Sequence, residues 1–270
     1  MTRITDLSAV ILCGGLGTRL REETEFKPKP MVEIGNRPIL WHIMKHYRHF
    51  QVGNFVLCTG YKGDVIRDYF LNYPLYNSDF AIDFATGDVE TLSNGCEEDW
   101  RVVLADTGRD TLTGSRIKRV LRYIQGETFL ATYGDGVADI DLDQLYAHHR
   151  ASGRLATVTA VRPSSRFGEL AIKDNLVTRF REKPQVTEGW INGGFFVFEK
   201  RAFEHVRFGD DVTLEESVLE RLAAEDQLSV YKHHGFWQSM DTYREMSLLN
   251  EMWGDGNAPW HIWQECRLSA

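Results

Sequence analysis

A short apolar run followed by a glycine-rich loop constrains the fold of this chain more than any other feature. Residues 7–12 read L-S-A-V-I-L, a pattern typical of a buried strand, and C-G-G-L-G-T-R-L follows directly. Gly14, Gly15 and Gly17 leave the loop nearly without side chains, so its backbone can turn sharply and bring N–H groups close to an anion. A glycine loop alone is equally typical of a tight turn, so the interpretation depends on what surrounds it.

Two cations flank this loop within an otherwise acidic segment. Arg19 follows the glycines directly, and Lys29 lies between Pro28 and Pro30. Cations near several glutamates are ordinarily exposed and form weak surface pairs. The two prolines, however, stiffen the backbone around Lys29 and orient its side chain, which suits a lysine that must contact a phosphate. Strand, glycine loop and two cations together indicate a site for a nucleoside triphosphate.

Strand and helix patterns alternate through the first half of the chain. Strand-like runs are expected at residues 7–12, 54–59, 101–105 and 128–133, and helical apolar spacing occurs at 38–50, 64–73, 113–124 and 142–150. This rhythm predicts an α/β fold with a parallel, doubly wound sheet. Ligands of such sheets bind beyond the carboxyl ends of the strands. We therefore expect the glycine loop, T-G-Y-K at 59–62 and Y-G-D-G at 133–136 to converge there.

The second half of the chain has a different character. Short strands are expected at residues 155–161, 169–173, 176–181 and 193–198, and helices at 214–224 and 243–253. With no repeat and no Pro/Ser-rich linker, residues 1–270 are expected to form a single domain. Its nucleotide-binding half would span about 7–150, and a half that completes the sheet and holds a second substrate about 151–253. The tail, 254–270, carries Trp260 and Trp263 and would pack on the body or on a neighbouring subunit.

Composition narrows the range of partners and compartments. The chain has 270 residues and a net charge of −8, which argues against a surface that coats nucleic acid but not against a local phosphate site. Its four cysteines, Cys13, Cys58, Cys96 and Cys266, form no C-x-x-C pair, so we expect a reducing compartment and no structural zinc. Cys13 and Cys58 lie at the ends of apolar runs and are expected to be buried thiols. There is no apolar run of membrane-spanning length and the first six residues are polar, so a cytoplasmic location is expected.

Two widely separated aspartates form a candidate magnesium pair. Asp135 lies between glycines after an apolar strand, where a turn-forming role is the common one. Asp241 precedes a helical segment in W-Q-S-M-D-T, where it could simply cap the helix. Magnesium that is bound with a nucleotide usually takes one or two carboxylates together with phosphates and water. If the two aspartates meet in space, they would supply that pair.

Other polar residues allow more than one interpretation. Lys183 in R-E-K-P could be an exposed turn residue, and Arg116 could lie on the solvated face of a helix. Asn192 and Gly193 precede an apolar strand, where Gly-Gly marks either a bulge or the close approach of another group. The D-I-D at 139–141 is the metal motif that a glycosyltransferase would need, but here it more typically opens the next helix. Histidine spacing indicates no zinc site, and no G-x-S-x-G nucleophile motif occurs.

These motifs belong to a longer ordered series. It reads C-G-G-L-G-T-R-L-R-E-E-T, K-P-K-P-M-V-E-I-G, P-I-L-W-H-I-M-K, G-Y-K-G-D-V-I, V-L-A-D-T-G, T-Y-G-D-G-V-A-D, R-F-G-E-L, E-K-P, I-N-G-G-F-F-V-F, G-F-W-Q-S-M-D-T and A-P-W. The series, from about residue 8 to about residue 260, resembles the sugar-1-phosphate nucleotidyltransferase family. R-E-E-T, T-Y-G-D-G-V-A-D and W-Q-S-M-D-T resemble its cytidylyltransferase branch. The resemblance implies a Rossmann-like α/β fold, with a mixed, mostly parallel sheet flanked by helices, and a homo-oligomer.

The resemblance also implies roles for individual residues. The nucleotide-binding residues would be Leu12, Gly14, Gly15, Gly17, Thr18, Arg19, Gly60, Tyr61, Thr113 and Arg116. The sugar-phosphate-binding residues would be Gly168, Glu182, Lys183, Asn192 and Gly193. Arg19, Lys29 and Lys183 would be the catalytic cations, and Asp135 and Asp241 would bind Mg²⁺. Two departures from the family pattern, Ser115 for a glycine and Ser239 for a proline, leave every catalytic side chain in place.

The implied reaction joins CTP, or another nucleoside triphosphate, to a sugar 1-phosphate and releases pyrophosphate. Glucose 1-phosphate would be the partner in the cytidylyltransferase branch, and the product would supply deoxysugar or polysaccharide synthesis. A phosphate monoester, with a second pKa of about 6, is largely dianionic at neutral pH and needs no general base. The alternatives are a sister enzyme that uses UTP, dTTP, GTP or another sugar phosphate, a non-catalytic module that binds nucleotide sugars, and a glycosyltransferase.

Overall fold

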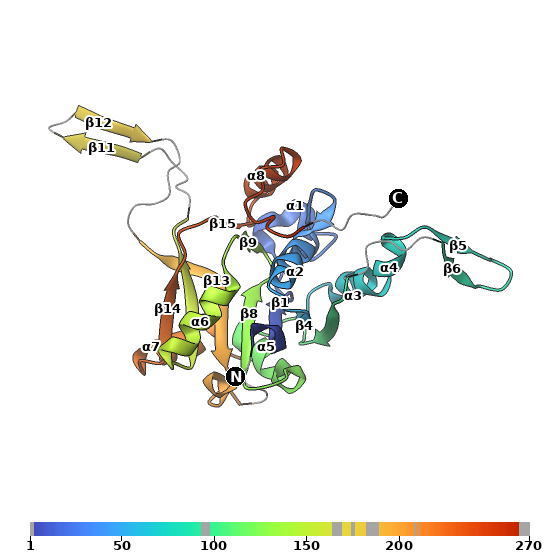
Figure 1. Ribbon diagram of the computed structural model, residues 1–270, viewed down its shortest axis with the longest axis horizontal. Helices are drawn as coiled ribbons and strands as arrows, with labels where there is room; N and C mark the ends of the chain where they lie inside the picture. Colours follow the sequence, from blue (N-terminus) through green and yellow to red (C-terminus); the bar gives the residue numbers. More distant parts are fainter. Residues whose placement is uncertain are drawn as a thin grey trace.

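A seven-stranded sheet forms the centre of the computed structural model (Figure 1). The structure describes residues 3–92, 98–163, 169–173, 176–181, 189–207, 209 and 211–264, with the backbone alone for Arg19, Arg21, Glu22, 169–173 and 176–181. The strand order is β14 (Leu228–Lys232), β10 (Ala156–Val161), β13 (Ile191–Glu199), β8 (Thr128–Tyr133), β1 (Ser8–Leu12), β4 (Asn54–Thr59) and β7 (Arg101–Asp106). Strands from both halves of the chain therefore share one sheet.

Most strand pairs in this sheet are parallel. β8, β1, β4 and β7 run parallel to one another, and β14 runs parallel to β10. β13 is antiparallel to both β8 and β10. This mixed, mostly parallel sheet confirms the predicted fold class, and the strands predicted at 7–12, 54–59, 101–105, 128–133, 155–161 and 193–198 all lie in it.

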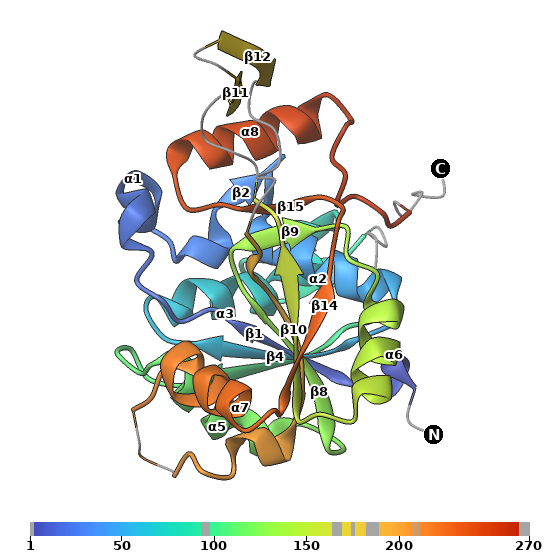
Figure 2. The same cartoon turned by 90° about the vertical axis from the view of Figure 1, so that its left-hand side faces the viewer.

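Helices cover both faces of the sheet. Successive strand residues point to opposite faces, so each central strand contributes apolar side chains to a core on either side. In β1, Ala9 and Ile11 join a core with α2 (Ile39–His49), α6 (Leu142–Ser152) and α3 (Gly63–Leu71). Val10 and Leu12 join a core with α5 (Thr113–Val120), the π-helix η6 (Leu214–Leu219) and α7 (Glu220–Ala224) on the other face (Figure 2). No helix of the described residues is long and apolar enough to cross a membrane.

The remaining elements, short except for α8, complete the described chain. They are η1 (Ile4–Asp6), η2 (Thr18–Leu20), α1 (Arg21–Thr24), η3 (Lys29–Met31), β2 (Glu33–Ile34), β3 (Arg37–Pro38), α4 (Tyr73–Tyr76), β5 (Phe80–Ile82), β6 (Val89–Thr91), η4 (Leu121–Tyr123), β9 (Gly136–Ala138), β11 (Glu169–Lys173), β12 (Leu176–Arg181), η5 (Lys200–Phe203), β15 (Trp237–Ser239) and α8 (Tyr243–Gly254). The hairpins β5–β6 and β11–β12 project from opposite sides of the body (Figure 1). β11 and β12 were predicted, whereas the exposed β5–β6 hairpin was not.

The C-terminal tail packs on the body of the same chain. Trp260 is fully buried, and its Nε1–H lies 3.4 Å from Nδ1 of His42 on α2. The Nε2 of His42 lies 2.8 Å from the carbonyl of Ile34, so the neutral ring with Nε2 protonated satisfies both contacts. Burial lowers the pKa of His42 to about 4, in spite of the hydrogen bond to Ile34. The described part of the tail, up to residue 264, therefore packs on the body of its own chain.

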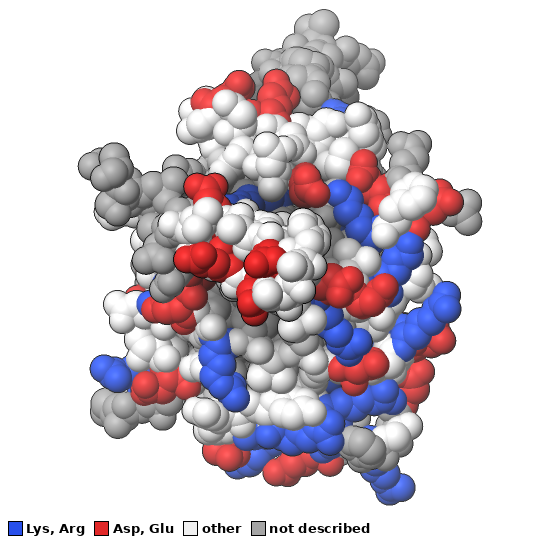
Figure 3. Space-filling model, turned by 90° about the vertical axis from the view of Figure 1, so that its right-hand side faces the viewer, with Lys and Arg blue, Asp and Glu red and all other residues white. Residues whose placement is uncertain are grey.

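Charged side chains are interspersed on the face shown in Figure 3, where acidic and basic groups lie side by side.

Cys13 and Cys58 are both free and buried, as the sequence predicted. Burial raises the pKa of Cys58 to about 12, so this thiol stays protonated at neutral pH. Cys96 and Cys266 lie outside the described residues.

Candidate active site

A cavity of about 700 Å³ opens beyond the carboxyl ends of β1 and β8. Predicted residues that line it are Leu12, Gly14, Gly15, Gly17, Thr18, Lys29, Thr113, Arg116, Asp135 and Asp241. The three loops meet through backbone hydrogen bonds, because Gly134 N donates to Leu12 O at 3.1 Å and Tyr61 N donates to Gly14 O at 3.3 Å. The predicted convergence of these loops at one edge of the sheet is therefore confirmed.

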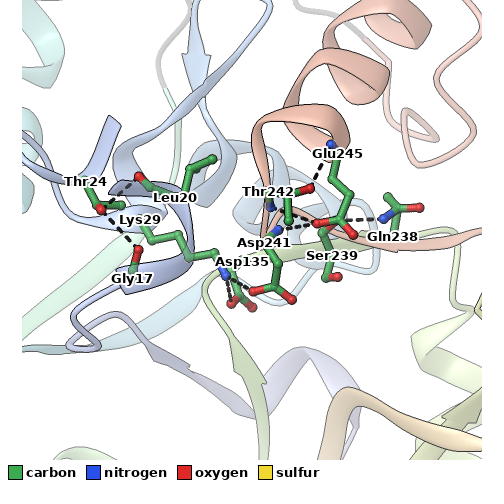
Figure 4. Close-up of polar contacts among 10 residues, drawn as sticks. All are labelled: Gly17, Leu20, Thr24, Lys29, Asp135, Gln238, Ser239, Asp241, Thr242 and Glu245. Carbon is green, nitrogen blue, oxygen red and sulfur yellow. Dashed lines mark hydrogen bonds and ion pairs between the residues drawn. The ribbon is translucent and has the colours of Figure 1, made fainter. Parts of the chain in front are cut away.

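Lys29 joins the two predicted metal-binding aspartates (Figure 4). Its Nζ lies 2.6 Å from Oδ2 of Asp135 and 2.5 Å from Oδ1 of Asp241. Lys29 itself is buried in the short helix η3, between its two prolines. Burial alone would lower the pKa of its ammonium, but the two carboxylates outweigh this effect and raise the pKa above its ordinary value. Lys29 is therefore a fixed cation at neutral pH.

Two short strands bring the aspartates together. β9 follows Asp135 directly and pairs with β15, which ends two residues before Asp241. The N–H of Met240 then donates to the carbonyl of Asp135 at 2.8 Å. This pairing places the two carboxylates side by side although 106 residues separate them in the chain. Neither β9 nor β15 carries enough apolar residues to be predicted from sequence.

A capping box at the start of α8 holds the backbone at Asp241. Oε2 of Glu245 accepts from the N–H groups of Asp241, at 2.8 Å, and Thr242, at 2.9 Å, while the Thr242 hydroxyl accepts from Glu245 N at 3.3 Å. Thr242 is therefore the N-cap residue, and Asp241 precedes it. The helix-cap alternative for the Asp241 side chain is thus wrong, and its carboxylate faces Lys29 (Figure 4).

The pair of carboxylates fits a divalent cation bound together with phosphates. Among the described residues, no group of three or more His, Cys, Asp or Glu could hold a metal ion by itself. Two carboxylates suffice for Mg²⁺ when phosphate oxygens and water complete an octahedron. Lys29 contacts the same carboxylates, so a bound cation and the ammonium would share them.

The glycine loop takes its shape from positive backbone torsion and from Thr24. Gly17 has φ of +62°, which favours glycine, and a Cβ there would lie 2.9 Å from Cγ2 of Thr24. The Thr24 hydroxyl lies 3.1 Å from Gly17 O and 2.9 Å from Leu20 O, so one side chain closes the loop (Figure 4). A Cβ on Gly15 would meet no atom within 4 Å, so its backbone borders open space. Thr18 lines the cavity, and the Arg19 side chain lies outside what the structure describes.

Arg116 is buried at the floor of the site, so the alternative of a solvated helix face is wrong. Its guanidinium donates to the carbonyls of Gly14 (3.0 Å), Thr59 (3.3 Å), Gly108 (2.7 Å) and Arg109 (3.0 Å) and to Oγ1 of Thr107 (2.7 Å). These acceptors come from the loops that follow β1, β4 and β7. A Cβ on Gly14 or Gly60 would lie 2.2 or 2.4 Å from Nη1 of Arg116. Glycine at both positions therefore makes room for the arginine.

Tyr61 supports the glycine loop from behind. Besides its backbone contact with Gly14, its hydroxyl donates to the carbonyl of Thr24 at 3.3 Å. Gly60 and Tyr61 are absent from the cavity lining. Tyr61 contacts the glycine-loop segment and Gly60 lies against Arg116, so both support residues that line the cavity without lining it themselves.

A carboxylate that sequence reasoning missed projects into the same cavity. Glu215, on the π-helix η6, accepts hydrogen bonds from the hydroxyls of Tyr133 and Thr113, the latter at 3.1 Å. Thr113 Oγ1 in turn accepts from Leu214 N at 2.8 Å. Ser115, one of the two departures from the family pattern, accepts from Val212 N at 2.8 Å and helps to fix this segment. Because 102 residues separate Thr113 from Glu215, no local sequence signal pairs them.

The predicted sugar-phosphate residues are described only in part. Asn192 Nδ2 lies 3.5 Å from the hydroxyl of Tyr133, and the carbonyl of Gly193 accepts from Nε1 of Trp237 at 2.7 Å. Both residues thus lie beside a wall of the cavity without lining it. Gly168, Glu182 and Lys183 fall outside the described residues.

Comparison with known proteins identifies the family. The family model described as Nucleotidyl transferase matches residues 8–250. The chain belongs to this family. This confirms the resemblance read from the sequence motifs.

Two relatives of this nucleotidyl transferase match it along nearly its whole length. The "Probable glucose-1-phosphate cytidylyltransferase" of Bacillus subtilis is 44% identical over 95% of this chain and 100% of its own length. The "Glucose-1-phosphate cytidylyltransferase" of Salmonella typhimurium is 48% identical over 96% of this chain and 100% of its own length.

Solved structures share the fold at low sequence identity. A putative glucose-1-phosphate thymidylyltransferase from Bacillus anthracis superposes with a TM-score of 0.64 at 16% identity and covers 96% of this nucleotidyl transferase and 98% of its own chain. HddC from Yersinia pseudotuberculosis gives 0.64 at 21% identity, over 92% and 99% of the two chains.

Proposed function

We propose that this nucleotidyl transferase is a glucose-1-phosphate cytidylyltransferase, which converts CTP and α-D-glucose 1-phosphate into CDP-glucose and pyrophosphate. The observation that carries the reaction type is the convergence of Lys29, Asp135 and Asp241 beside the glycine loop in one cavity. The names of the two relatives at 44% and 48% identity support the choice of substrates. The product would supply nucleotide sugar for deoxysugar or polysaccharide synthesis.

The chain's own residues would act mainly by positioning and by neutralising charge. The attacking sugar phosphate is dianionic, so the difficulty is to bring two anions together. The glycine loop would receive the triphosphate, with Arg19 and Lys29 opposing its charge. Asp135 and Asp241 would hold Mg²⁺, which neutralises phosphate oxygens when bound. Lys183 would hold the incoming phosphate, with Gly168, Glu182, Asn192 and Gly193 around the hexose.

Base choice separates this proposal from its nearest rival. A "D-glycero-alpha-D-manno-heptose 1-phosphate guanylyltransferase" of Aneurinibacillus thermoaerophilus is 30% identical over 80% of this chain. The test is pyrophosphate release with CTP, UTP, dTTP and GTP, each against glucose 1-phosphate and a second sugar 1-phosphate, with Mg²⁺. We expect turnover to be fastest with CTP and glucose 1-phosphate. Preference for another base would move the chain to a sister activity, and no turnover with any pair would leave a binding module.

We further propose a homo-oligomer in the cytoplasm. The β5–β6 hairpin leaves Phe80, Ile82, Phe84 and Val89 exposed, and such apolar clusters mark interaction surfaces. Light scattering coupled to size exclusion tests the assembly, and Phe84→Glu should reduce its mass. The buried free thiols of Cys13 and Cys58 are compatible with a reducing compartment.

A further inference from the structure

We infer that the carboxylate of Glu215 binds hydroxyl groups of a sugar ring in the active-site cavity and thereby sets which sugar the enzyme accepts. The inference deepens the proposed function, because it assumes that the cavity holds a nucleotide and a sugar phosphate. It concerns a residue that neither the sequence motifs nor the family roles single out. The ring is either the ribose of the nucleotide or the hexose of the sugar phosphate, since both offer the same hydroxyl chemistry.

The first step is the place of Glu215 relative to the reacting centre. Its Oε1 accepts from Tyr133, which is two residues before Asp135. Its Oε2 accepts from Thr113, at the start of α5. Glu215, Tyr133, Thr113 and Asp135 all line the same cavity. Glu215 therefore lines the same cavity as the Lys29–Asp135–Asp241 cluster.

The second step is the charge of the group. A carboxylate inside a cavity built for phosphates would repel them, so it must face a part of the substrate that donates hydrogen bonds. An ionised carboxylate accepts only, and it offers about four lone-pair positions on two oxygens. Among the described residues its partners are two hydroxyls and no cation. The Tyr133 and Thr113 hydroxyls use one position on each oxygen, which leaves both oxygens able to accept again.

The third step is the fixed orientation of these partners. Leu214 N–H occupies the Thr113 oxygen as an acceptor, so the Thr113 proton is directed at Glu215. Asn192 Nδ2, at 3.5 Å, lies near the Tyr133 oxygen from the other side. Thr113, Glu215 and Tyr133 thus form a hydrogen-bonded row that lines the cavity, and Asn192 lies beside its Tyr133 end. Glu215 lies on the π-helix η6, and π-helical turns are rare but frequent at functional sites.

The fourth step is the chemistry of the partner. Ribose is joined to the α-phosphate through one methylene, and a hexose 1-phosphate is joined directly to its phosphate. Both rings therefore lie next to the reacting phosphorus, which would be bound in the cavity that Glu215 lines. Two neighbouring ring hydroxyls can donate to the two oxygens of one carboxylate, and hydrogen bonds to a charged group are stronger than neutral ones.

The test compares Glu215→Gln with the wild type on matched substrates. The ribose arm measures kcat/KM for CTP and 2′-deoxy-CTP, and the hexose arm measures it for glucose 1-phosphate and its 2-deoxy and 6-deoxy analogues. We expect the wild type to prefer the hydroxylated substrate in one arm by roughly 10- to 100-fold, as for a lost charged hydrogen bond, and the variant to lose most of that preference. The arm that responds identifies the ring.

Controls separate this role from a structural one. Glu216→Gln, at the exposed neighbour of Glu215, should leave all ratios at wild-type values. Tyr133→Phe removes a donor to Glu215 but keeps the carboxylate, so it should keep the preference whatever its rate. If Glu215→Gln lowers rates while the preference for the hydroxylated substrate stays unchanged in both arms, Glu215 has only a structural role and the inference is overturned. A change confined to the CTP/UTP ratio would also overturn it, because the base amine would then be the partner.

A binding arm keeps this inference distinct from the proposed reaction. The shift in melting temperature is measured with CTP, 2′-deoxy-CTP and glucose 1-phosphate, without turnover. Stabilisation of the wild type by CTP without any pyrophosphate release would overturn the proposed activity, and the binding ratios would still decide the role of Glu215. Equal shifts by hydroxylated and deoxy ligands in wild type and variant would overturn the inference.

Discussion

Lys29 and Asp241 are 212 positions apart in the chain, and their side chains meet in an ion pair with a nitrogen–oxygen distance of 2.5 Å. The same ammonium lies 2.6 Å from Asp135. One lysine thus serves as the countercharge of two carboxylates that are expected to hold a metal ion. Its removal should therefore change catalysis, stability and metal binding together.

Lys29→Met should lower turnover by about 10² to 10³-fold, the usual loss when a preorganised charge contact is removed. In EDTA it should also lower the melting temperature, since Asp135 and Asp241 would face each other without a cation. Mg²⁺ should restore more stability to this variant than to the wild type. Pyrophosphate release and melting curves with and without Mg²⁺ measure these effects. Lys27→Met, which removes ion pairs with Glu23 and Glu33 outside the cavity, is the matched control. Turnover at the wild-type rate in Lys29→Met would contradict the mechanism.

Arg116→Lys should raise the KM for the nucleotide by roughly tenfold or more, because an ammonium cannot reach all the acceptors of the guanidinium. Buried carbonyls left unpaired cost about 1–3 kcal/mol each, so the loops after β1, β4 and β7 should lose their fixed arrangement. Steady-state kinetics with each substrate varied in turn separate this effect from one on the sugar phosphate. Arg122→Lys, at an exposed residue, should behave as the wild type. An unchanged nucleotide KM would show that Arg116 does not organise the site.

Glu245→Ala should weaken Mg²⁺ dependence and stability together. It removes the acceptor of the Asp241 and Thr242 N–H groups, and loss of a helix cap costs about 1 kcal/mol. We expect the Mg²⁺ concentration for half-maximal rate to rise, because the backbone at Asp241 is no longer held. Mg²⁺ titrations of the rate provide the measurement, with Glu251→Ala on the exposed part of α8 as the control. Equal Mg²⁺ curves would mean that the capping box does not position Asp241.

Stability should fall as pH drops from 6.5 towards 4, because His42 is buried as the neutral ring. Its pKa is lowered from 6.5 to about 4, so the unfolded chain binds the proton first in this window. The full loss from His42 is about 3 kcal/mol at 1.36 kcal/mol per pKa unit. Urea unfolding at pH 7.5, 6 and 5 gives the slope. His42→Phe should reduce the slope without abolishing it, because burial also lowers the pKa of His46 to about 4. His49→Gln, at an exposed ring, should leave the slope unchanged, and identical slopes in all three proteins would contradict this assignment.

The parts of the fold that sequence predicted are those with a strong local pattern. β1, β4, β8 and β13 are apolar runs bounded by polar loops, so their periodicity is sufficient. β5–β6 went unpredicted because all its residues are exposed and carry no burial pattern. β9 and β15 have three residues each and depend on each other for pairing.

The candidate site divides in the same way. The glycine loop, Lys29 between prolines and Asp135 after a strand are recognisable because each is a local arrangement of residue types. The burial of Arg116 was open from sequence, because its acceptors are main-chain carbonyls on three loops. No sequence pattern pointed to Glu215, because its place in the site depends on hydrogen bonds to Tyr133 and Thr113, which are distant in the chain.

The sequence by itself determined most strands of the central sheet, the glycine loop after the first of them and the family, because all three reside in short stretches of chain. The tertiary structure alone decided that Lys29 is shared by Asp135 and Asp241, and that Glu215 faces the same cavity. These residues are separated by up to 212 positions. Their meeting follows from strand order in the sheet and from the β9–β15 pairing, which depend on the packing of the whole chain.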